Sequence, residues 1–186
     1  MKSIVKQIKS PQFLVVIASI EQDLIYDDQI PFHITNFKKK TEWINTRLLI
    51  RNYFPKNELH YNKYGAPQIS SKAISISHTN NYTSFIVANK KAAIDIEKIS
   101  DRTLELVTKF LNLKEQEKFN TPIETTICWS AKECLYKLHQ KGNLDFIKDL
   151  EVKFIEQNFV LCRLYQQEIK LHLQKFADHV LVYYYE

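Results

Sequence analysis

The sequence predicts an α+β protein made of two similar halves, each with one long amphipathic helix and several strands. The chain has 186 residues, which is enough to bury a sizeable core, and its 45% hydrophobic and 25% charged residues are typical of a globular protein. Two segments with helical periodicity lie among short alternating segments typical of strands. Because no linker rich in Gly, Pro or Ser is present, we expect residues 1–90 and 91–186 to pack as one body.

The first half is expected to contain a buried strand near the N-terminus, one long helix and further strands. Thr41 is expected to be the N-cap of the helix, which carries Glu42 in its first turn and ends before Pro55. The expected strands of this half are residues 13–19, 74–77 and 82–89, and a turn is expected at residues 64–67.

The second half is expected to begin with a strand at residues 92–97, followed by a helix at about residues 102–110. A longer helix is expected at residues 125–140, with its C-terminal stop near Gly142. Four strands are then expected to close an antiparallel sheet, at residues 150–156, 159–165, 169–174 and 179–185.

Composition excludes several classes of site. The chain has two glycines, Gly65 and Gly142, so it has no Gly-rich phosphate loop or dinucleotide-binding fingerprint, and any phosphate must be held by side chains, a metal or helix ends. A net charge of +5 is compatible with an acidic partner or a polyphosphate ligand. The basic residues are spread out apart from the run Lys38-Lys39-Lys40, and we expect no nucleic-acid partner.

The cysteines and the N-terminal segment indicate a cytoplasmic protein. Cys128, Cys134 and Cys162 lack metal-binding spacing and are expected to be buried free thiols in a reducing compartment. The apolar run at residues 13–20 is too short to span a bilayer, and no convincing cleavage site follows it. We therefore expect no membrane association.

The segment Ala93-Ile94-Asp95-Ile96-Glu97 alternates apolar and acidic residues with the period of a strand. Asp95 and Glu97 then share one face, and each carboxylate disfavours ionisation of the other. A hard divalent cation such as Mg²⁺ is the simplest reason for this pair, because it takes oxygen ligands from a few carboxylates and from substrate phosphates. The alternative is an edge strand with a solvated acidic face.

The predicted helix at residues 125–140 carries the second candidate group. Trp129, Glu133 and Lys137 are spaced i, i+4, i+8 and share one face, with Lys132 next to it. By itself, the Glu133–Lys137 pair is more typical of an ordinary surface ion pair than of a site. Another face is expected to pack on the sheet through Ala131, Leu135 and Leu138.

Three motifs, in the same order along the chain, resemble those of the 4′-phosphopantetheinyl transferase superfamily. They are Ser77-His78-Thr79, Ala93-Ile94-Asp95-Ile96-Glu97 and Trp129-Ser130-Ala131-Lys132-Glu133-Cys134-Leu135-Tyr136-Lys137, which resemble the patterns (I/L)SH(S/T), (G/A)(I/V)D(I/V)E and WxxKEAxxK. The segment Glu42-Trp43-Ile44-Asn45-Thr46-Arg47-Leu48-Leu49 resembles the EWxxxRxLL pattern of the single-chain, surfactin-synthetase-type branch. The resemblance covers about residues 38–140.

This resemblance implies a fold of two α+β halves related by a pseudo-twofold axis, with the active-site cleft between them. It implies an enzyme that moves the 4′-phosphopantetheine arm of coenzyme A to a serine of an apo acyl or peptidyl carrier protein. A monomer is expected, because one chain supplies both halves of the cleft. Two alternatives remain open: a catalytically weak relative that binds coenzyme A or a carrier protein without turnover, and a basic nucleic-acid module.

The resemblance also implies roles for the acidic residues. Asp95 and Glu97, completed by Glu133, would hold Mg²⁺ or Mn²⁺ at the diphosphate of coenzyme A. Glu133 is the candidate base for the carrier serine, directly or through a metal-bound water. Lys137 would contact a phosphate oxygen. Together, these roles make Asp95, Glu133 and Lys137 the catalytic residues that the resemblance implies.

Coenzyme A contacts are implied at His78, Arg47, Lys40, Lys132 and Lys137. Each of three residues has an alternative role. His78 could be a turn histidine hydrogen-bonded to the backbone, Arg47 could be a structural residue of its helix, and Lys132 could contact the carrier protein. Trp129 is expected to pack rather than to bind.

The chain departs from the family pattern at two positions. Ala66 stands where the family often has a phosphate-binding lysine in Gly-Lys-Pro, so this contact is lost or has moved, with Lys63 as the candidate replacement. Ala93 replaces the commoner glycine, which we expect to be a minor change.

Overall fold

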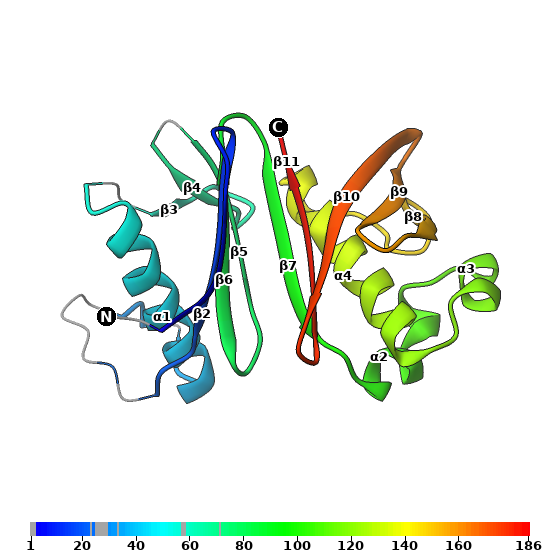
Figure 1. Ribbon diagram of the computed structural model, residues 1–186, viewed down its shortest axis with the longest axis horizontal. Coiled ribbons are helices and arrows are strands. Elements are labelled where there is room, and N and C mark those ends of the chain that lie inside the picture. The colour runs from blue at the N-terminus through cyan, green and yellow to red at the C-terminus, as the bar shows by residue number, and fades with distance from the viewer. Residues whose placement is uncertain (1–2, 23, 25–29, 33, 57–58, 71) are drawn as a thin grey trace.

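The computed structural model describes residues 3–22, 24, 30–32, 34–56, 59–70 and 72–186. The protein has four layers, in which two antiparallel sheets pack face to face and one long helix covers the outer face of each sheet (Figure 1). The predicted α+β class with two similar halves is therefore confirmed.

The first sheet has six strands in the order β1-β2-β6-β5-β4-β3. The predicted strands of this half are confirmed, whereas β1, β3 and β4 were not predicted. β3 and β4 are short and flank the predicted turn, where Gly65 has a positive φ of 80°. The bounds of β1 to β6 are Ile4–Lys9, Phe13–Ser19, His60–Tyr61, Pro67–Ile69, Lys72–His78 and Tyr82–Ala88.

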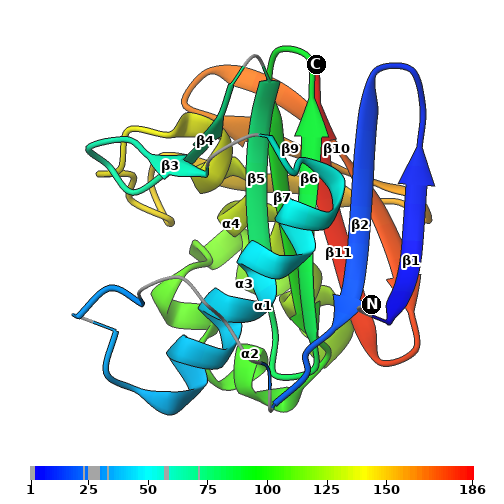
Figure 2. The same cartoon turned by 90° about the vertical axis from the view of Figure 1, so that its left-hand side faces the viewer.

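Helix α1 spans Phe37–Tyr53 and lies over β5 and β6, while β1 and β2 extend beyond it (Figure 2). The expected N-cap at Thr41 is wrong, because the helix begins one turn earlier. The Asn36 side chain caps it by accepting a hydrogen bond from the Lys39 N–H at 3.2 Å, and the Thr41 hydroxyl donates to the Phe37 carbonyl inside the helix. Apolar side chains fix α1 on the sheet, among them Leu49, Ile50, Val16, Phe85 and Val87.

The second sheet has five strands in the order β7-β11-β10-β9-β8. Its predicted strands are all confirmed, and β10 is longer at both ends than expected. The change from the first sheet to the second falls between β6 and β7. The bounds of β7 to β11 are Ala92–Lys98, Leu150–Ile155, Phe159–Leu164, Gln167–Phe176 and His179–Tyr185.

The helices of the second half differ in detail from the prediction. The helix expected at residues 102–110 is divided into α2, Asp101–Glu105, and the 3₁₀ helix η1, Val107–Lys109, while α3, Leu113–Lys118, was not predicted. Helix α4 spans Pro122–His139. In the described part of the chain, no helix has both the length and the apolar character needed to cross a membrane.

The caps of α4 explain its bounds. Thr121 and Glu124 form a capping box at the N-terminus, where Pro122 takes the first helical position, so the helix starts before residue 125. At the other end Gln140 adopts the left-handed conformation with φ of 59° and stops the helix, just before Gly142.

Two apolar interfaces position the functional elements. Between the sheets, Ile94 and Ile96 of β7 pack among residues of β2 and β6 such as Val15, Ile17 and Ile86. Under α4, a larger core contains Cys128, Cys134 and Cys162, which are buried free thiols as predicted. Strand β7 therefore lies between the first sheet and α4.

Candidate active site

The acidic face of β7 is buried beneath α4. Ile94 and Ile96 point into the core between the sheets, so Asp95 and Glu97 point the other way, toward the helix. Asp95 is 3% exposed. Strand β7 is at the edge of its sheet, but the alternative of a solvated acidic face is wrong.

Asp95 joins the two halves through one oxygen. Its Oδ1 accepts hydrogen bonds from Lys137 Nζ of α4 at 2.7 Å and from Ser77 Oγ of β5 at 2.9 Å. Its Oδ2 is buried and has no hydrogen-bond partner among the residues that the structure describes. An unpartnered buried carboxylate oxygen is costly, and it is expected at sites where a ligand completes the set of contacts.

Glu97 and Glu133 are affected by the charge of Asp95. Burial and the neighbouring Asp95 raise the pKa of Glu97 to about 7, although a hydrogen bond from Trp129 Nε1 to Glu97 Oε1 at 3.1 Å opposes the shift. Burial and Asp95 also raise the pKa of Glu133, and Lys137 opposes this shift. The charge of Asp95 therefore disfavours ionisation of both Glu97 and Glu133.

Lys137 is the cation of this cluster. Burial alone would lower the pKa of its amino group, but the charge of Asp95 and their hydrogen bond outweigh burial and raise it. The amino group also donates to the Ile94 carbonyl at 3.1 Å. One ammonium therefore faces three carboxylates, which leaves an excess of negative charge.

The donor set fits a hard divalent cation. Carboxylate oxygens are the ligands that Mg²⁺ and Mn²⁺ take, and the unpartnered Asp95 Oδ2 together with the raised pKa of Glu97 indicates uncompensated acidic charge. As arranged here, the described residues include no group of three or more His, Cys, Asp or Glu side chains close enough to hold a metal among themselves. A substrate phosphate is the expected additional source of oxygen ligands.

A cavity of about 520 Å³ lies beside this cluster and is lined by both halves. The first half contributes α1, the turn between β3 and β4, and β5, and the second half contributes the C-terminal end of α4. Arg47, His78 and Lys137 line it, whereas Lys40 is not among its described lining residues and the neighbouring Lys39 is. Further lining residues include Glu42, Trp43, Tyr61, Tyr64, Tyr136 and Gln140.

Arg47 has an unsatisfied donor on the cavity wall. Its guanidinium stacks on Trp43, with its Cζ 3.8 Å from the ring centroid, and lies 5.7 Å from the centroid of Tyr61. Its Nη1 is buried without a hydrogen-bond partner in the described part of the chain. A fixed planar cation with a free donor is a binding group for an anion such as phosphate.

His78 lies at the end of β5 and is more exposed. Its Nε2 is 3.7 Å from Glu42 Oε2, so an acidic group stands beside it on the same wall. Ala66 also lines the cavity, but Lys63 does not; the Lys63 amino group lies over the Tyr64 ring, 5.0 Å from its centroid. Lys39 is the additional cation of this wall.

Comparison with known families connects this geometry to a reaction class. The family model described as the 4′-phosphopantetheinyl transferase superfamily matches residues 92–183. This segment runs from β7 to β11 and contains the whole acidic cluster with Lys137. The chain belongs to the 4′-phosphopantetheinyl transferase superfamily. A comparison with curated proteins finds no match.

The transferase family assignment rests on the second half, while the cavity needs both. Of the residues implied by the resemblance, Asp95, Glu97, Glu133 and Lys137 lie together between β7 and α4. Arg47 and the adjacent cavity wall come from the first half, outside the matched segment. Lys39 on the cavity wall and Ser77 beside Asp95 were not predicted as site residues, although both lie inside segments singled out in the sequence, the run Lys38-Lys39-Lys40 and the motif Ser77-His78-Thr79.

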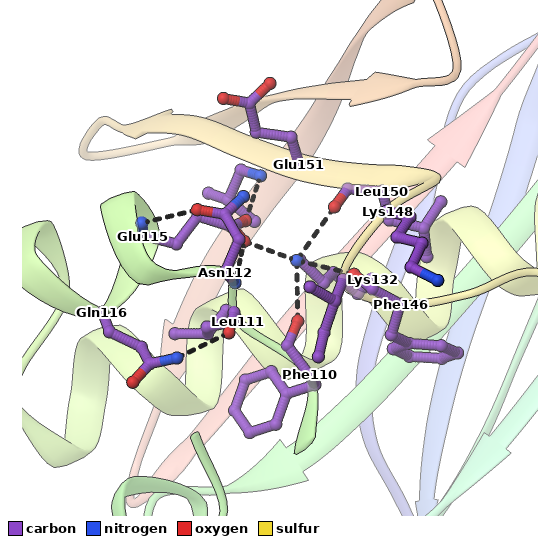
Figure 3. A network of polar contacts seen from close by, with 12 residues as sticks. Phe110, Leu111, Asn112, Glu115, Gln116, Lys132, Phe146, Lys148, Leu150 and Glu151 are labelled. Atoms are coloured by element: carbon purple, nitrogen blue, oxygen red, sulfur yellow. Dashed lines mark hydrogen bonds and ion pairs between the residues drawn. The ribbon is translucent and has the colours of Figure 1, made fainter. Parts of the chain in front are cut away.

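Lys132 is not at the cavity. It is fully buried on the other side of α4, where its amino group donates to the carbonyls of Phe110, Phe146 and Leu150 at 2.7, 2.8 and 3.0 Å (Figure 3). It also bonds Glu115 Oε2 at 2.8 Å. The expected contact of Lys132 with coenzyme A or a carrier protein is therefore corrected: its charge is used inside the core.

Glu115 extends this buried contact into a network. Its Oε2 also accepts from the Asn112 N–H at 2.9 Å (Figure 3). Its Oε1 accepts from the Val152 N–H at 2.7 Å. The pair connects α3, α4 and the start of β8. Removing one partner would leave the other as an uncompensated buried charge.

We expect Lys132→Met to lower the free energy of unfolding by about 3–5 kcal/mol, because it leaves the Glu115 carboxylate buried without its cation. Urea unfolding measures this loss. The double variant Lys132→Met/Glu115→Gln is expected to lose less than the sum of the two single changes. The exposed Lys148→Met is the control, with an expected effect within about 0.5 kcal/mol. Additive single effects would contradict the paired role.

The raised pKa of Glu97 predicts a specific dependence of stability on pH. Because its folded-state pKa of about 7 exceeds the ordinary 4.5, the folded protein binds this proton more tightly than the unfolded chain. Glu97 therefore costs little below pH 4.5, destabilises the fold increasingly between pH 4.5 and about 7, and costs a constant amount at higher pH. Glu97→Gln should gain stability relative to the parent protein over this range.

Urea unfolding of both proteins between pH 4.5 and pH 8 measures this difference. Glu117→Gln, at an exposed position on α3, controls for the removal of a carboxylate in general. A difference between Glu97→Gln and the parent that stays constant over this pH range would show that Glu97 does not titrate as described.

Proposed function

We propose that the protein transfers the 4′-phosphopantetheine group of coenzyme A to a serine of an apo acyl or peptidyl carrier protein, with Mg²⁺ or Mn²⁺ as cofactor. The observation that carries this proposal is the partly buried cluster of Asp95, Glu97, Glu133 and Lys137 beside a cavity lined by both halves. The family assignment supports the transferase class.

In this proposal the two halves of the chain have different roles. Residues 1–90 would supply most of the nucleotide-binding wall, and residues 91–186 the reacting groups, in agreement with the change of sheet between β6 and β7. A single chain then suffices, as in a monomer. A cytoplasmic location is supported by the free cysteines in the core of the second half.

Coenzyme A would place its nucleotide end in the cavity. Arg47, Lys39 and His78 offer cationic or polar groups to its phosphates, and Trp43 and Tyr61 offer aromatic faces. The volume of about 520 Å³ is in the range of sites for small molecules and cofactors. The diphosphate would then lie near Lys137, which lines the cavity and bonds Asp95.

The reaction is a substitution at phosphorus. The serine oxygen of the carrier protein forms a bond to the phosphorus nearer the pantetheine, the bond from that phosphorus to the bridging oxygen breaks, and adenosine 3′,5′-bisphosphate leaves. Positioning and neutralisation of charge supply most of the catalysis in such reactions. When bound at Asp95, Glu97 and Glu133, a divalent cation would supply positive charge to the diphosphate oxygens.

The chain's own residues have separate roles in this step. Lys137, whose pKa is raised by Asp95, stays protonated and neutralises charge on the departing phosphate. Glu133 is the candidate base that takes the proton of the serine, and before a cation binds, burial and Asp95 raise its pKa. Trp129 holds Glu97 in place through its indole N–H.

A second function has one observation in its favour. Ala66 lines the cavity at the position where the family often has a phosphate-binding lysine, which would suit a relative that binds coenzyme A or a carrier protein without turnover. Lys39 and the unsatisfied donor of Arg47 favour the active transferase, because they supply cationic groups on the same cavity wall.

Intact-mass analysis of carrier proteins tests the transfer. With coenzyme A and Mg²⁺, we expect an apo carrier from a panel of acyl and peptidyl carriers to gain the mass of one phosphopantetheine, and EDTA should prevent the gain. Asp95→Ala and Glu133→Ala should lose activity by at least about a hundredfold, the lower range for general acid–base catalysis, while circular dichroism shows an intact fold. Full activity in both variants would overturn the site assignment. Coenzyme A binding without transfer to any carrier would favour the inactive relative.

Replacement of Arg47 tests how the nucleotide is bound. We expect Arg47→Met to raise KM for coenzyme A about tenfold to a hundredfold with little change in kcat, because a charge-assisted hydrogen bond to a phosphate contributes about 1.5–3 kcal/mol in both ground and transition states. Arg51→Met, one turn further along α1, is the matched control. If Arg47 binds the 3′-phosphate, the variant will also lose its preference for coenzyme A over dephospho-coenzyme A. An unchanged KM would leave Arg47 with a structural role.

A further inference from the structure

Two serines of β5 satisfy the free edge of β7. Strand β7 pairs with β11 along one edge, and its other edge faces β5 of the first half. Ser75 Oγ accepts a hydrogen bond from the Ile94 N–H at 3.2 Å, and Ser77 Oγ accepts one from the Ile96 N–H at 3.3 Å. Buried N–H groups that would lack a partner are thus satisfied by side chains of the other half.

Ser77 has a second contact that Ser75 lacks. Its hydroxyl donates to Asp95 Oδ1 at 2.9 Å, and both side chains are buried, with Ser77 6% exposed. A hydroxyl has one proton. Because Ser77 Oγ accepts from the Ile96 N–H, its own proton is directed to the carboxylate. The position of Ser77 is itself fixed by Ser84, whose hydroxyl donates to the Ser77 carbonyl at 2.9 Å.

The two donors to Asp95 come from opposite halves. Lys137 of α4 and Ser77 of β5 both bond Oδ1, while Oδ2 has no partner among the described residues. Two donors to one oxygen hold the carboxylate against rotation about its terminal bond. The oxygen that remains free is therefore presented in one fixed direction.

We propose that Ser77 is a positioning residue that orients the Asp95 carboxylate for its metal and makes this orientation depend on the docking of the two halves. The inference rests on the proposed function, since it assigns Asp95 to the metal. Ser77 itself acts through Asp95. Outer hydrogen bonds of this kind commonly change metal affinity by about 10- to 100-fold.

Direct metal binding tests this role without turnover. Mn²⁺ is titrated into the full-length protein with saturating coenzyme A and no carrier protein, and free Mn²⁺ is followed by electron paramagnetic resonance. We expect Ser77→Ala to weaken Mn²⁺ binding about 10- to 100-fold, and Ser77→Thr, which retains the hydroxyl, to restore most of the affinity. Asp95→Ala measures the background binding by coenzyme A itself.

Ser75→Ala is the matched control. Both alanine variants remove one acceptor for a β7 N–H, so both should lower the free energy of unfolding by a similar amount in urea. Ser75→Ala should nevertheless bind Mn²⁺ like the parent protein, because Ser75 does not contact Asp95. The comparison uses metal affinity and not rate, since Ser75 lies on the cavity wall.

The outcomes separate this inference from the proposed function. If the parent protein binds Mn²⁺ and Ser77→Ala binds it equally well, the positioning role of Ser77 is overturned and the metal site stands. If the parent does not bind Mn²⁺ above the Asp95→Ala background, the metal site and this inference both fail. If Ser77→Ala does not fold, Ser77→Cys, with a similar shape and a weaker donor, replaces it. Unchanged affinity in that variant also overturns the inference.

Discussion

The burial of β7 on three sides is the constraint on which the rest of the structure depends. Its apolar face closes the core between the sheets, its acidic face lies under α4, and its free edge meets the serines of β5. One strand can have both an apolar face and an acidic face, because neighbouring residues point to opposite sides. This arrangement holds the acidic charge of Asp95 and Glu97 away from bulk water, and we propose that the site uses this charge to bind a cation.

Consecutive residues of α4 show two different uses of a buried charge. Lys132 is surrounded by three carbonyls and the Glu115 carboxylate, so its ammonium joins neighbouring elements, although burial lowers its pKa. Glu133 lies on the other side of the helix, where burial and the nearby Asp95 carboxylate raise its pKa. Paired and hydrogen-bonded charges are typical of structural networks, whereas carboxylates with raised pKa values beside a cavity are typical of functional sites. Lys132 and Glu133 are adjacent in sequence but point to different sides of α4, one into the core and the other toward the site.

Most strands were predictable because alternation and turn residues are local signals, whereas β1 and the short β3 and β4 were not predicted. The placement of Asp95, Glu97, Glu133 and Lys137 was predictable because their spacing fixes them on one strand face and one helix face. The start of α1 was less predictable. Asn36 and Thr41 are both good N-cap residues, and the choice between them depends on packing. The burial of Lys132 in the core, and the position of Lys39 rather than Lys40 on the cavity wall, depend on how each helix is oriented relative to the other half. Sequence periodicity does not contain that information.

The hydroxyl of Ser77 was unpredictable for a related reason. Its partners, Asp95 and the Ile96 N–H, lie on a strand of another sheet, and their approach is set by how two apolar faces fit together. A motif identifies the residue types at such a contact. It does not say which side chain crosses from one half to the other.

The chain contains two tryptophans, and each half has one of them next to the cavity or the acidic cluster. Trp43 is stacked under the Arg47 guanidinium on the cavity wall, and Trp129 is hydrogen-bonded to Glu97. Indole emission responds to nearby charge and polarity, so the protein has an intrinsic optical reporter in each half. With one tryptophan replaced by phenylalanine, the other reports on its own half alone. Nucleotide entry and cation binding are thereby followed separately in the two single-tryptophan variants.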